Sequence, residues 1–68
     1  MDQNVLNMEI RKFLKLVGIT SQQKIEKMVE NALKNGSLKS NQSMKVSVTL
    51  IMEDLGLHHE IEGEIKLE

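Results

Sequence analysis

Residues 44–52 read MKVSVTLIM, and their side chains alternate between apolar and other types. A period of two is typical of a β-strand that has one apolar face and one solvated face. The even-numbered positions are all apolar: Met44, Val46, Val48, Leu50 and Met52. We therefore predict a strand over residues 44–52.

The same alternation returns over residues 57–67, where we predict a second strand. Its apolar face is odd-numbered and comprises Leu57, His59, Ile61, Gly63, Ile65 and Leu67. The four residues between the strands, Glu53-Asp54-Leu55-Gly56, have the composition of a turn. We expect a four-residue hairpin loop in which Gly56 takes a positive φ.

The register of this hairpin follows from parity and charge. An even-numbered face can meet an odd-numbered face only if paired residue numbers sum to an odd number. A sum of 109 sets Lys45 opposite Glu64, whereas a sum of 111 sets it opposite Lys66. Opposite charges across strands are favoured, so we predict the sum of 109, which pairs Val48 with Ile61.

Before residue 36 the apolar period is that of a helix. We predict a first helix over residues 4–17, with Asp2 or Asn4 as its N-cap. Gly18 stands where a left-handed residue would end it. Its apolar face is broad and consists of Val5, Leu6, Ile10, Phe13, Leu14, Leu16 and Val17.

A second helix is predicted over residues 21–35, after which residues 36–43 form a loop. Thr20 and Gln23 have the spacing of a capping box, and Ser21 is the alternative cap. Asn35 and Gly36 are expected to end the helix in a left-handed cap. Its apolar stripe comprises Ile25, Met28, Val29, Ala32 and Leu33.

The predicted fold is α+β with the order α-α-β-β, in which two amphipathic helices cover one face of an antiparallel hairpin. The 68 residues form one domain, over residues 1–68. A chain of this length buries only about 60% of its unfolded surface, so its stability is marginal. Because cysteine is absent, no disulfide can compensate, and we expect a second copy of the chain to do so.

Pairing between the first strands of two copies would give a homodimer with a four-stranded sheet. The predicted interface consists of Val46, Val48, Thr49 and Leu50. The second strand is less suitable for this contact. Pairing it with its copy would bring the carboxylates of Glu60, Glu62 and Glu64 close to the same three carboxylates of the second chain, and these like charges repel. The alternative is a dimer through the apolar positions of the helices, with the sheet edges left free.

The composition argues against several classes of function. The net charge of -1 argues against a strongly basic nucleic-acid-binding protein. No stretch approaches the ~18 apolar residues of a membrane span, and the opening residues MDQNVLN do not resemble a secretory signal. No serine or histidine lies in a catalytic motif. We expect a cytoplasmic protein that is not an enzyme, has no cofactor and has no membrane partner.

A resemblance to a known family rests on two segments and two shorter pieces. The segments are Asn7-x-x-Ile10-Arg11-Lys12-Phe13-Leu14-Lys15 and Val17-Gly18-Ile19-Thr20-Ser21-Gln22, and the pieces are Gly-Leu near Leu57 and Glu-Gly-Glu-Ile near Glu62. The chain resembles, over essentially its whole length, a family of small bacterial proteins of unknown function. That resemblance implies a bacterial, cytoplasmic protein and carries over no site.

Charge is divided unevenly along the chain. Residues 1–45 have a net charge of +4 and residues 46–68 a net charge of -5. The basic residues favour an anion or nucleic-acid surface made by Arg11, Lys12, Lys15 and Lys27. The turn before residue 21 is also similar to the entry of a helix-turn-helix motif. The competing interpretation is an ordinary solvated helix face, which we prefer.

His58 and Glu60 are the best candidates for metal ligands. They are two residues apart on a strand and therefore share a face, whereas His58 and His59 point to opposite faces. Two ligands do not make a zinc site, although two copies of the chain could supply four. A solvated end of the hairpin is the simpler interpretation, and we predict no metal site.

Overall fold

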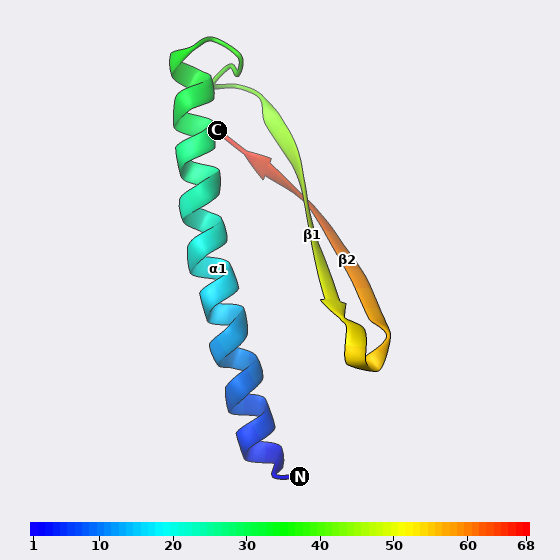
Figure 1. Ribbon diagram of the computed structural model, residues 1–68. Coiled ribbons are helices and arrows are strands. Elements are labelled where there is room, and N and C mark those ends of the chain that lie inside the picture. Colours follow the sequence, from blue (N-terminus) through cyan, green and yellow to red (C-terminus); the bar gives the residue numbers. More distant parts are fainter. The chain divides into compact units, whose positions relative to one another are not determined.

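The computed structural model describes all residues from 1 to 68. The elements follow the order α1 (Gln3–Lys34), β1 (Ser43–Met52), a short 3-10 turn η1 (Glu53–Leu55) and β2 (Leu57–Lys66) (Figure 1). They divide into a helical unit, Met1–Ser37, and a hairpin unit, Leu38–Glu68. The α+β class and the hairpin are confirmed.

The ends of α1 are defined by short polar side chains. The Asp2 carboxylate accepts hydrogen bonds from the backbone N–H groups of Asn4 at 2.9 Å and Val5 at 3.3 Å. These N–H groups have no carbonyl partner within the helix, so the cap stabilises the first turn. At the other end Gly36 takes a φ of 81°, and the Asn35 side chain accepts from the Ser37 N–H at 3.0 Å. The predicted caps at Asp2 and Gly36 are confirmed.

The predicted break into helices over residues 4–17 and 21–35 is wrong, because α1 continues from Gln3 to Lys34. Gly18 does not take a positive φ. Thr20 is not a cap either, because its hydroxyl donates to the Leu16 carbonyl at 2.9 Å, within the helix. A glycine in a helix interior costs only about 1 kcal/mol relative to alanine. Propagation adds a backbone hydrogen bond for each further residue, so an extended helix tolerates that cost.

Because α1 is continuous, its two apolar stripes join into one line of side chains, which we call the α1 seam. Its members lie within an arc of about 120° around the helix axis. They are Leu6, Ile10, Phe13, Val17, Ser21, Ile25, Met28 and Ala32. Ser21 is the only polar member of the seam, although the polar side chains of Asn7, Lys24 and Asn31 lie within the same arc. The spacing of these residues is present in the sequence. It is not recognised as one line when Gly18 is interpreted as the end of a first helix, because the two stripes are then assigned to separate helices.

The hairpin has the predicted register. Val48 lies opposite Ile61, Lys45 opposite Glu64 and Met52 opposite Leu57, so paired residues sum to 109. Gly56 takes the predicted left-handed conformation, with a φ of 63°, and closes the four-residue connection. β1 begins one residue earlier than predicted and β2 ends one residue earlier, at Lys66.

No side chain in the chain is buried. Phe13, the only aromatic residue, is 53% exposed, and Met28 and Ile61 are 69% and 55% exposed. Large apolar side chains that remain open to water on both units are unusual for a monomeric protein. Each unit therefore has an apolar face and no core of its own.

Candidate functional site

One face of the hairpin is almost entirely apolar. The pairs on this face are Met44 with Ile65, Val46 with Gly63, Val48 with Ile61, Leu50 with His59 and Met52 with Leu57. Cross-strand pairs of aliphatic side chains stabilise a hairpin when their face is covered. Gly63 leaves a shallow dent here, since a Cβ at this position would lie 3.6 Å from the Val46 Cγ1 atom.

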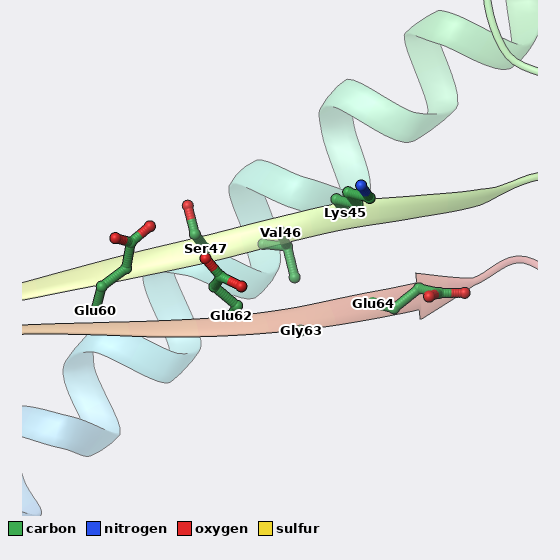
Figure 2. Close-up of a pocket in the computed structure, with 7 residues that line it drawn as sticks. All are labelled: Lys45, Val46, Ser47, Glu60, Glu62, Gly63 and Glu64. Carbon is green, nitrogen blue, oxygen red and sulfur yellow. The ribbon is translucent and has the colours of Figure 1, made fainter.

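The opposite face of the hairpin is acidic. Figure 2 shows Glu60, Glu62 and Glu64 along β2, beside Lys45 and Ser47 of β1, around an open hollow. The register sets Glu62 opposite Ser47 and Glu64 opposite Lys45. All of these side chains are exposed to solvent. The arrangement has no enclosed space in which two carboxylates could act as acid and base, so it is a charged, solvated sheet face.

The histidines occupy opposite faces, as strand geometry requires. His58 lies opposite Ile51 on the acidic face and His59 lies opposite Leu50 on the apolar face. His58 and Glu60 share their face, as expected from their spacing. The structure contains no group of three or more histidine, cysteine or acidic residues that could hold a metal ion.

The four basic candidates do not form one patch. Arg11 and Lys15 are one turn apart on α1 and lie on the same side of it, and Lys12 lies next to Arg11. Lys27 is twelve residues beyond Lys15, which corresponds to about 18 Å along the axis. The helix-turn-helix interpretation is wrong, because α1 has no turn before residue 21. What remains is a basic group formed by Arg11, Lys12 and Lys15 in the first half of the helix.

An apolar groove follows the first half of α1. It is lined by Phe13, Leu16 and Ile19, with the stems of Lys12 and Lys15 and the side chain of Glu9 at its margins. Lysine stems commonly lie along apolar surface while the ammonium remains in water. This groove lies beside the α1 seam and widens the apolar surface around Phe13. A surface of this kind suits contact with another apolar surface.

No helix of this chain is both long and apolar enough to cross a membrane.

The comparisons with known proteins give one match. Neither the curated proteins nor the solved structures include one that matches this sequence. A model described as "Family of unknown function (DUF6494)" matches residues 1–68, which is the entire sequence. The expectation of a small protein family of unknown function is confirmed. On this evidence the chain belongs to the family of unknown function DUF6494.

Proposed function

We propose that this protein is a homodimeric interaction module that catalyses no reaction, and that its two chains cover each other's apolar surface. The observation that carries the proposal is the exposure of apolar side chains within each unit. Phe13 and Met28 of α1 are 53% and 69% exposed, and Ile61 of the hairpin is 55% exposed. Contiguous apolar faces of this kind mark surfaces that bind another molecule.

Obligate homodimers bury such faces between their chains, in interfaces that resemble a domain core divided between two chains. No side chain of the single chain is buried, which agrees with a core that is completed only when the copy is present.

We propose that the free edge of β1 forms one contact. Antiparallel pairing of two β1 strands centred on Val48 would give a four-stranded sheet and satisfy the edge. It would join Val46, Val48 and Leu50 of both chains into one apolar layer, next to the uncharged Thr49. β2 is the poorer edge, because it carries three glutamates on one face. A contact of this kind is isologous, as twofold symmetry requires.

A single introduced cysteine tests the β1 contact, because the natural chain has none. Val48→Cys would place two thiols directly opposite each other across the twofold axis, at a Cα separation that a disulfide can span. Ile61→Cys is the matched control, since Ile61 lies opposite Val48 within the hairpin and on the same face. We expect disulfide-linked dimers from Val48→Cys under mild oxidation and none from Ile61→Cys. The reverse result would assign the edge contact to β2.

A second candidate is an anion-binding or nucleic-acid-binding role for the basic group. It is supported by the exposure of Arg11, Lys12 and Lys15 on neighbouring positions of one rigid helix. The resemblance to small bacterial proteins favours a bacterial, cytoplasmic setting for either role. The homodimer is the better supported proposal because it accounts for the exposed apolar side chains of both units.

A further inference from the structure

The α1 seam has a spacing that reads the same in both directions. Its successive members are 4, 3, 4, 4, 4, 3 and 4 residues apart. A second α1 that runs antiparallel can therefore place a seam residue at the level of every seam residue of the first. In that register the residue numbers of facing positions sum to 38, and the twofold axis passes at the level of residue 19.

We propose that α1 packs antiparallel against α1 of the second copy in this register, as a further contact of the homodimer. The facing pairs are Leu6 with Ala32, Ile10 with Met28, Phe13 with Ile25 and Val17 with Ser21. The inference rests on the proposed homodimer and does not depend on the β1 contact. Both contacts are isologous, as the twofold symmetry of a homodimer requires.

The sizes of the seam residues favour the antiparallel arrangement over the parallel one. Antiparallel packing sets each small residue against a larger one, because Ala32 meets Leu6 and Ser21 meets Val17. Parallel packing would set Phe13 against Phe13 and Ala32 against Ala32, which leaves one layer overfilled and another hollow. Interiors pack at uniform high density, and both faults cost stability. Parallel packing would also create a layer made only of Ser21 hydroxyl groups.

Electrostatics agree with the same choice. Antiparallel helices align their macrodipoles favourably, whereas parallel helices place like ends together. A sum of 38 sets Glu9 at the level of Val29 and Lys24 at the level of Leu14, so neither of these charges meets a like charge. A parallel pair would instead bring the basic groups of Arg11, Lys12 and Lys15 from both chains to the same half of the dimer.

Exposure supports a second copy as the occupant of this surface. Ile10, Phe13 and Met28 are 47%, 53% and 69% exposed in the single chain. The other seam residues are exposed at Leu6 and half-buried at Val17, Ser21, Ile25 and Ala32. The seam runs from Leu6 to Ala32, which corresponds to about 39 Å of helix. A surface of that length needs a partner as long as itself. A second α1 has the required length and the complementary spacing.

The experiment uses two full-length proteins that each carry one cysteine, Ile10→Cys and Met28→Cys. They are mixed, allowed to exchange subunits and treated with a short bismaleimide. We expect covalent dimers in the mixture only. Within a homogeneous sample the two thiols at position 10 would be 18 residues apart along the axis, which is about 27 Å. The matched control is a mixture of Met8→Cys and Glu30→Cys, whose numbers also sum to 38 but which lie on the opposite side of α1.

The outcomes separate this inference from the proposed homodimer. Covalent dimers from either protein alone would indicate parallel helices and overturn the inference. A dimeric mass by light scattering without cross-linking in the mixture would overturn the α1 contact and leave the homodimer intact. A monomeric mass of the unmodified protein would overturn both. Cross-linking confined to the first mixture would confirm the antiparallel register.

Discussion

Replacing Gly18 by alanine should stabilise the protein, and this substitution tests the continuity of α1. In a helix interior, alanine is favoured over glycine by about 1 kcal/mol, because glycine loses more backbone entropy on folding. The full gain is available at this position, because a Cβ added to Gly18 meets nothing within 4 Å. For a protein of this size, 1 kcal/mol raises the melting temperature by about 4–8 °C.

The measurement is thermal unfolding followed by far-ultraviolet circular dichroism, at one fixed protein concentration because dimer stability depends on it. Gly36→Ala is the matched control. An added Cβ at Gly36 is equally free of contacts, but φ there is 81°, so alanine should cost about 1–2 kcal/mol. If Gly18 ended a first helix in the left-handed conformation, both substitutions would destabilise the protein. A lower melting temperature for Gly18→Ala would therefore refute the claim that α1 is continuous at residue 18 and that space is free beside this residue.

Three further predictions concern the cap, the register and the basic group. Asp2→Ala should lower the free energy of unfolding by about 1 kcal/mol because two first-turn N–H groups lose their acceptor; urea denaturation measures this, and Asp2→Asn should retain most of the stability. Lys45→Glu should cost from a few tenths to about 1 kcal/mol by facing Glu64, and Glu64→Lys in the same chain should restore it; without such a rescue in the double variant, the pairing would be wrong. If the basic group is an ordinary solvated face, no duplex or single strand should shift in mobility at about 50 mM salt; a shift that Arg11→Ala abolishes would instead favour the second candidate function.

The hairpin was predictable from the sequence because two independent constraints agree. Side-chain parity limits the register to odd sums, and the charge of Lys45 relative to Glu64 selects one of them. The turn adds a third constraint, since Gly56 can adopt the positive φ that closes the connection. Each of these signals lies within one hairpin, whose strands are joined by only four residues, so no knowledge of how other elements pack is needed.

The break at Gly18 was predicted wrongly because the local signals there are ambiguous. A glycine followed by threonine and serine is typical of the end of one helix and the start of another. The same residues are tolerated inside a helix when the hydroxyl group finds a carbonyl, as the Thr20 hydroxyl does at Leu16. The cost of about 1 kcal/mol at glycine is smaller than the cost of nucleating a second helix. The α1 seam depends on this continuity, so it emerges only once the helix is known to be unbroken.

The candidate metal and anion sites were predictable only where their residues lie within one element. His58 and Glu60 share a strand face, as their spacing requires, and no third ligand joins them within the chain. Arg11, Lys12 and Lys15 are neighbours on any helix, whereas including Lys27 in their group depended on a bend that α1 does not have. Sequence spacing places residues within one element reliably. It places residues of different elements only when the connection between those elements is known.

The mass of the protein in solution tests the central claim most directly. Sedimentation equilibrium on the unmodified chain, over a series of concentrations, measures it without labels or substitutions. The account predicts a species of twice 7.8 kDa, which loses its helical signal as it dissociates because neither unit of the single chain has a core of its own. A folded species of 7.8 kDa that keeps full helical signal throughout the series would contradict the homodimer and, with it, the proposed role of both apolar surfaces.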